Sequence, residues 1–191
     1  MKRPSLPLWK LTRVRYDRMV DTGILDDEDG VELLDGLLVV REPQGSRHAV
    51  VVGLVRAVLE RAFGRRYHVR EEKPFALDDV SEPEPDLVVV PGPARAYSDF
   101  HPSKAVLVVE VADSSLELDR VRKGTLYARA GVADYWIVNL VDEVLEVYRH
   151  PLPASQRRAA RYGSLRVVKR NSTVTPLAAP RARVRVGSVL P

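Results

Sequence analysis

Pro85-Asp86-Leu87-Val88-Val89-Val90 and Val106-Leu107-Val108-Val109-Glu110 are two apolar runs that predict the centre of the fold. Each apolar run has the length of a buried strand, and each has a carboxylate at one end. A helix-like segment that carries Lys123 comes next in the chain. Charged groups are costly in apolar surroundings unless they are paired, hydrogen-bonded or bound to metal. The stretch from Pro85 to Trp136 therefore suggests a metal-dependent hydrolytic site.

Alternation along the second strand places its carboxylate on an apolar face. Side chains point to opposite faces in turn, so Val106, Val108, Glu110 and Ala112 share one face. If the two strands are neighbours, Asp86 and Glu110 meet at one edge of the sheet. Hard divalent ions such as Mg²⁺ prefer oxygen ligands and keep several waters, so two carboxylates and a main-chain carbonyl would suffice.

Lys123 is the third element of this candidate site. On a helical wheel it shares a face with Leu116, Leu126 and Tyr127, which favours an inward orientation. A lysine there could orient or activate an attacking water, or stabilise charge that develops on a phosphate. The alternative is a surface pair between Asp119 and Lys123, four residues apart and worth about 0.2–0.5 kcal/mol.

Two further residues are weaker candidates on residue chemistry alone. Glu32 precedes a hairpin turn and could be a solvent-facing strand residue. His48 begins a long helix, where its ring could contact a phosphate, although a histidine near a helix start is commonly a surface or capping residue. No His-Glu-x-x-His, Gly-x-Ser-x-Gly or phosphate-binding Gly-rich motif is present in the sequence. The zincin, α/β-hydrolase and P-loop classes therefore lack support.

The hydrophobic pattern predicts one domain over residues 1–191, with a mixed sheet flanked by helices (α/β or α+β). Residues 1–11 are expected to be a flexible lead-in. The predicted helices are 13–22 (after Thr12), 46–61 (ended by Gly64) and 114–130 (a capping box of Ser114 and Glu117). The predicted strands are a hairpin over 31–40 around Asp35-Gly36, then 67–77 broken by Pro74, 86–90, 105–112, 135–140 and 144–148, with two or three short strands after a basic loop at 150–162.

Composition narrows the class of protein. The chain of 191 residues is 45% hydrophobic and contains no cysteine, which excludes disulfides, thiol nucleophiles and cysteine-ligated zinc. No apolar run reaches the length of a membrane span, and the N-terminus lacks the apolar core of a signal peptide. A cytoplasmic protein without a membrane partner is the expectation.

The net charge of +4 conceals an asymmetry along the chain. Residues 149–191 hold ten Lys or Arg and no Asp or Glu, so the remainder is acidic. A basic segment of this kind can supply phosphate contacts to nucleic acid. The alternative is an arginine-rich solvated surface with no partner.

Taken in order, the motifs resemble the Uma family of putative restriction endonucleases, within the PD-(D/E)XK nuclease superfamily. Each segment alone is weak, and the specificity lies in the ordered set over residues 15–190. The segments are Val31-Glu32-Leu33-Leu34-Asp35-Gly36, His48, Glu84-Pro85-Asp86-Leu87-Val88-Val89-Val90, Val108-Val109-Glu110-Val111-Ala112-Asp113-Ser114-Ser115, Asp119-Arg120-x-x-Lys123-x-x-x-Tyr127 and Gly131-Val132-x-x-Tyr135-Trp136-Ile137-Val138.

The resemblance implies a restriction-endonuclease-like fold and a Mg²⁺-dependent DNA endonuclease, with Mn²⁺ as a second metal. By position, Asp86 and Glu110 would bind the metal, the carbonyl of Val111 would complete the shell, and Lys123 would be catalytic. Glu32, His48, Tyr127 and Asp113 would line the site. Many nucleases of this fold act as dimers, so a homodimer is expected by analogy.

One departure from the superfamily pattern leaves an alternative function open. The usual lysine two residues after the glutamate is replaced by Ala112, and the family resemblance assigns the lysine to the next helix, as Lys123. The missing strand lysine motivates the alternative of a non-catalytic nucleic-acid-binding or interaction module on a nuclease-like fold. A third interpretation treats the carboxylates as strand-end residues paired with arginines.

Overall fold

The computed structural model describes residues 8–41 and 44–191. A six-stranded sheet with the order β3-β4-β5-β6-β7-β8 forms its centre. Only β5 and β6 pair in parallel, and the other neighbouring strands are antiparallel, so the sheet is mixed as predicted. The strands of this sheet are β3 (Tyr67–Glu71), β4 (Leu87–Pro91), β5 (Leu107–Ala112), β6 (Asp134–Asn139), β7 (Val144–Leu152) and β8 (Arg161–Lys169).

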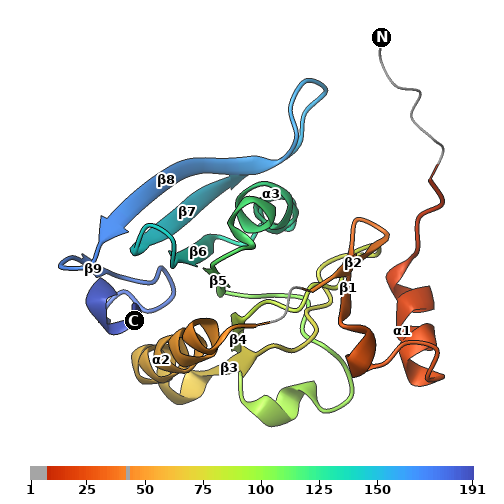
Figure 1. Cartoon of the computed structure of the whole chain (residues 1–191), viewed down its shortest axis with the longest axis horizontal. Coiled ribbons are helices and arrows are strands. Elements are labelled where there is room, and N and C mark those ends of the chain that lie inside the picture. Colours follow the sequence, from red (N-terminus) through yellow and green to blue (C-terminus); the bar gives the residue numbers. More distant parts are fainter. Residues whose placement is uncertain (1–7, 42–43) are drawn as a thin grey trace.

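Helices cover both faces of this sheet (Figure 1). On one face lies α2 (Ser46–Phe63), together with the C-terminal segment that contains β9 (Thr173–Val174), β10 (Val184–Arg185) and a short 3₁₀ turn, η5 (Val186–Ser188). On the other face lies a continuous helical segment made of η4 (Leu118–Lys123) and α3 (Gly124–Arg129). Within the described residues, no helix is long and apolar enough to cross a bilayer.

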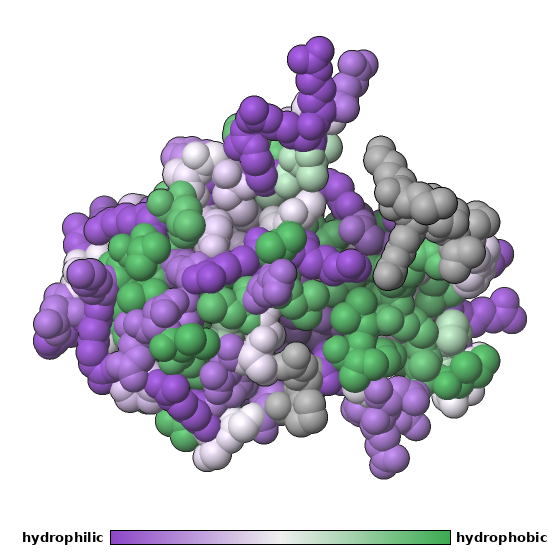
Figure 2. All heavy atoms as spheres, turned by 45° about the horizontal axis from the view of Figure 1, so that its top comes forward, coloured by the Kyte–Doolittle hydropathy of each residue, from purple (hydrophilic) through white to green (hydrophobic). Residues whose placement is uncertain are grey.

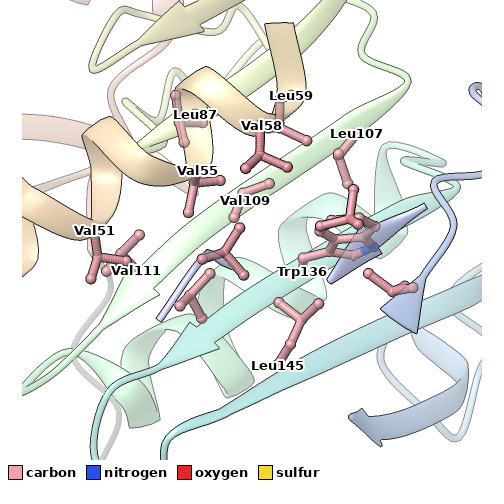
Figure 3. Packing of buried hydrophobic residues seen from close by; sticks show 14 of the residues in the cluster. Val51, Val55, Val58, Leu59, Leu87, Leu107, Val109, Val111, Trp136 and Leu145 are labelled. Atoms are coloured by element: carbon pink, nitrogen blue, oxygen red, sulfur yellow. The ribbon is translucent and has the colours of Figure 1, made fainter. Parts of the chain in front are cut away.

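The core between α2 and the sheet follows directly from the apolar periodicity of the sequence. Val51, Val55, Val58 and Leu59 recur at helical spacing and are all buried. Figure 3 shows these side chains directed toward apolar residues of the sheet, including Leu87, Val109 and Trp136. Because α2 is anchored along its length, both of its ends are fixed relative to the sheet.

The predicted hairpin is present and packs beside the opposite face of the sheet. β1 (Val31–Leu34) and β2 (Leu37–Val40) pair in antiparallel register around Asp35 and Gly36. These two residues have φ values of 53° and 77°, as a type I′ turn requires. The buried side chain of Leu34 joins the core beneath α3, which anchors the hairpin.

The N-terminal prediction is partly wrong. Residues 1–7 lie outside the described residues, but Leu11 is buried and its N–H donates to the Gly36 carbonyl at 2.9 Å. The following helix, α1 (Arg13–Asp21), begins after Thr12 as predicted, although the Thr12 side chain makes no capping hydrogen bond.

Several predicted boundaries shift in the structure. The first long helix ends at Phe63 rather than residue 61, and Gly64 follows it with φ of 59°. The strand predicted over 67–77 ends at Glu71. At the other end of the sheet, β7 and β8 are nine residues each, so the basic loop is shorter than residues 150–162. Figure 2 shows this hairpin tip projecting from the molecule with hydrophilic residues on it.

The hairpin turn provides a test of local stability. In Gly36→Ala the new Cβ would lie 2.7 Å from the Lys10 Cβ and 3.0 Å from the Leu11 carbonyl oxygen, at a positive φ. We expect a loss of about 2–4 kcal/mol in the free energy of unfolding, from the left-handed backbone and the steric overlap together. Gly131→Ala is the matched control, because Gly131 also has a positive φ, but a Cβ added there would meet no atom within 4 Å.

The control should lose about 1 kcal/mol. Urea unfolding of both variants measures the difference. Equal losses would show that the steric overlap with the N-terminal segment adds nothing to the loss.

Candidate active site

The antiparallel register of β4 and β5 brings the two strand-end carboxylates together. Leu87 is opposite Val109, so Asp86 and Glu110 are the next pair along the ladder. The N–H of Asp86 donates to Glu110 Oε2 at 3.3 Å, and the N–H of Val111 donates to Asp86 Oδ2 at 2.6 Å. Each carboxylate therefore accepts a main-chain hydrogen bond from the other segment, and both residues line the same pocket.

Lys123 reaches Glu110 from the helical segment on the other side. Its Nζ lies 3.2 Å from Glu110 Oε1 and 3.3 Å from Glu32 Oε1. Both carboxylates are buried, and the Lys123 residue is only 7% exposed. The surface-pair alternative for Lys123 is wrong, because neither Asp119 nor Lys123 is on the surface.

A π-helical turn sets the position of this lysine. In η4 the Gly124 N–H donates to the carbonyl oxygen of Asp119, five residues earlier. The Tyr135 hydroxyl donates to the same carbonyl at 3.0 Å, and the Ser115 hydroxyl donates to Asp119 Oδ2 at 2.6 Å. Such π turns are rare and are frequent at functional sites. Asp119 and Lys123 both belong to this turn, and both line the pocket.

The helix begins later than the capping box of Ser114 and Glu117 predicts. The helical residues begin at Leu116, and the Ser115 hydroxyl donates to Asp119 Oδ2. Asp119, for which the sequence predicts no role in the site beyond its place in the motif with Lys123, lies in the pocket and is 2% exposed.

The residues predicted to line the site occupy different positions around it. The Tyr127 hydroxyl donates to Glu110 Oε1 at 2.7 Å, and Tyr127 is fully buried. His48 Nε2 lies 3.2 Å from Asp86 Oδ2 at the N-terminal end of α2. Asp113 is exposed and lies at the rim of the same pocket.

Glu32 closes the site from the hairpin. Its Oε2 accepts the Glu84 N–H at 2.9 Å, while its other oxygen faces Lys123. Glu84 is paired with Arg41 and lines the pocket too. In the sequence, Glu84 opens the motif that contains Asp86, but the motif predicts no role for it. The cavity of about 170 Å³ is thus bounded by the hairpin, α2, β4, β5 and the helical segment.

Negative charge exceeds positive charge in the pocket around Glu110 and Lys123. Burial raises the pKa of Glu110 well above its usual range, and Asp119, Asp86 and Glu32 raise it further, while Lys123 lowers it. Burial opposes the charged form of Lys123, but Glu110, Glu32, Asp119 and Asp86 outweigh it and hold the pKa of Lys123 well above its usual range. Four carboxylates therefore surround one ammonium group.

This donor set fits a hard divalent cation. No cluster of three or more His, Cys, Asp or Glu side chains in the described part of the chain forms a ready-made metal cage. Mg²⁺ does not require one, because it commonly uses one or two carboxylates with waters and substrate phosphates. Asp86 and Glu110, with the adjacent Val111 main chain, offer oxygen ligands where the buried negative charge exceeds what Lys123 can offset.

The sheet order, the helices on both faces and the edge pocket define a restriction-endonuclease-like fold. A putative nuclease of the DUF820 group from Anabaena variabilis ATCC 29413 has the same fold, with a TM-score of 0.69 at 14% identity over 88% of this chain and 94% of that chain. The type IIG restriction endonuclease BpuSI aligns with a TM-score of 0.38 at 17% identity, over 63% of this chain and 14% of that chain. No curated protein matches the sequence.

The sequence itself identifies the family. Residues 15–181 match the Uma2 family, described as "Putative restriction endonuclease". The chain belongs to the Uma2 family, and this membership supports a nuclease function.

The buried ammonium group gives a pH-dependent prediction for stability. We expect Lys123→Met to lower the free energy of unfolding by about 3–5 kcal/mol at pH 8, because it leaves buried carboxylates without a cation. The folded-state pKa of Glu110 already lies above its ordinary value of 4.5 and rises further in the variant. The folded variant therefore keeps a proton that the unfolded chain releases as pH rises, and its deficit is smaller at pH 5 than at pH 8.

Urea unfolding at both pH values measures this difference. Lys104→Met is the control, since Lys104 is an exposed lysine with no ion pair within the described residues. A Lys123→Met deficit that is equal at pH 5 and pH 8 would contradict the assigned electrostatic origin.

Proposed function

We propose that this protein is an endonuclease that hydrolyses phosphodiester bonds of DNA with Mg²⁺, or Mn²⁺ in its place. The observation that carries the proposal is the convergence of Asp86, Glu110 and Lys123 from three different elements into one pocket. The nuclease character of the Uma2 family supports the reaction class. The metal, the DNA substrate and the residue roles are the proposed part.

In this proposal Asp86, Glu110 and the main-chain carbonyl of Val111 would hold the ion. When bound, the cation supplies positive charge that offsets the negative charge developing on the phosphate in the transition state. Tyr127 orients Glu110 through its hydroxyl hydrogen bond, and His48 orients Asp86 through Nε2. These contacts leave the ligand oxygens positioned before substrate arrives, which reduces the reorganisation that the reaction requires.

Lys123 is best suited to an electrostatic role. Its raised pKa keeps the side chain protonated at neutral pH, so it is a hydrogen-bond donor and a cation rather than a proton acceptor. Among the roles considered from sequence, the raised pKa favours stabilising charge on the phosphate oxygens and orienting the attacking water, over removing a proton from it.

Plasmid cleavage with Mg²⁺ or Mn²⁺ tests the proposal. We expect Glu110→Gln and Lys123→Met each to reduce the cleavage rate about 100-fold or more, since each removes charge that acts on the reacting phosphate. Glu117→Gln is the matched control, because Glu117 is an exposed carboxylate next to the same helical turn. Cleavage by both site variants at the rate of the wild type would overturn the assignment.

Metal binding gives a readout that is independent of cleavage. Calorimetric titration with Mn²⁺ alone should give a binding isotherm for the wild type that is lost in Asp86→Asn and kept in Glu117→Gln. DNA binding without any Mn²⁺ binding would instead favour the alternative of a non-catalytic nucleic-acid-binding module. Cutting both strands of a duplex at once requires two active sites, so a homodimer is part of the proposal. Light scattering measures the oligomeric state.

A further inference from the structure

A second groove, lined by arginines, lies far from the active site on the α2 side of the sheet. It has a volume of about 530 Å³ and is formed by the C-terminal end of α2 and the segment around β10. Four of its lining residues carry guanidinium groups and none carries a carboxylate. The four are Arg61, Arg181, Arg183 and Arg185, and all are exposed. We call this feature the arginine groove.

The positive charge of the arginine groove is uncompensated. Within residues 8–41 and 44–191, none of the four arginines forms an ion pair with an acidic side chain. Arg183 donates to neutral acceptors, namely the Thr175 hydroxyl and the carbonyls of Pro180 and Ala182. Four guanidinium groups gathered without a counter-charge repel one another, and a polyanion relieves that repulsion.

The active-site pocket has the opposite electrostatic character. Seven acidic residues line it, against the two permanent cations Arg41 and Lys123. A pocket of this charge repels a phosphate backbone unless a cation is bound, so it cannot supply the affinity that holds a long nucleic acid. That affinity must come from another surface, and sequence-independent binding comes mainly from Lys and Arg contacts to phosphates.

Helix α2 joins the two places rigidly. His48 at its start contacts Asp86, and Arg61, thirteen residues later, lines the arginine groove. At about 1.5 Å per residue the separation along the helix axis is about 20 Å.

The other wall of the groove is also fixed. The Val186 N–H donates to the Ser172 carbonyl at 2.9 Å, and the Gly187 N–H donates to the Arg170 carbonyl at 2.8 Å. Val184 and Val186 are buried against the same core as α2. The arginines of the C-terminal segment are therefore held on a packed scaffold.

We propose that the arginine groove binds the phosphate backbone of the same DNA duplex whose phosphate reaches the active site. This inference rests on the proposed nuclease function for the identity of the polyanion. The groove supplies affinity without sequence information, and the acidic pocket supplies the chemistry. The two tasks are separated because the same surface cannot be acidic enough to hold a divalent cation and basic enough to hold a phosphate backbone.

Binding without cleavage tests the groove apart from the active site. The experiment uses the full chain with Glu110→Gln and a fluorescein-labelled duplex of about 24 base pairs, with anisotropy measured over a series of salt concentrations. Arg61→Gln, Arg181→Gln and Arg185→Gln are combined in one groove variant. We expect the slope of log K against log salt to fall in magnitude by about 0.9 for each phosphate contact removed, so by about 2 to 3 in total.

The control variant removes the same charge elsewhere. It combines Arg95→Gln, Arg157→Gln and Arg158→Gln, three exposed arginines outside the groove. We expect its slope to stay close to that of the parent. Arg181→Glu alone is a second groove variant, with one exposed side chain changed, and it should weaken binding more than Arg158→Glu.

Each outcome decides between the two proposals. A groove variant with an unchanged slope, or a control that loses as much, overturns the groove inference and leaves the plasmid-cleavage result untouched. Loss of slope only in the groove variant supports the inference even if no cleavage is found. Tighter binding of an RNA duplex of the same sequence, with the same dependence on the groove, overturns DNA as the occupant.

Discussion

The contact between the Lys123 ammonium and the carboxylates of Glu110 and Glu32 is the interaction on which the site depends. Three parts of the fold meet there: the central sheet, the helical segment and the hairpin. A buried charge of either sign is expensive alone, so each partner is needed to keep the others in place. The surplus of carboxylates around this single cation is also what makes the pocket suited to a metal ion.

The sheet makes this arrangement possible through its register. In an antiparallel pair, residues at the start of one strand face residues at the end of its neighbour. The first residue of β4, Leu87, pairs with Val109 near the end of β5. Asp86 and Glu110, the next residue on each strand, are therefore adjacent. A shift of one residue in β5 would turn Glu110 toward the core beneath α2, where it would have no partner.

Charge is divided between the two ends of α2. The acidic pocket at its start and the arginine groove at its end lie about 20 Å apart along the helix. In our proposals the pocket binds a cation and the groove binds a polyanion. The apolar side chains of α2 that pack on the sheet fix this separation. The asymmetry of charge along the sequence thus becomes an asymmetry in space, since the basic C-terminal segment folds back beside the end of α2.

The sequence alone predicts the mixed α and β fold, the type I′ turn at Asp35-Gly36, and the candidates Asp86, Glu110 and Lys123, because these follow from alternation, turn chemistry and motif order. It failed at Leu11, at the end of β3 and at the start of the helical segment, where contacts between distant residues override local preference. The tertiary structure sets the burial of Asp119 and Lys123, because Glu32 and Glu110 pair with Lys123 and Tyr135 of β6 bonds to the π turn that carries both residues. It also gathered four arginines from two distant segments into one groove, which no local pattern specifies.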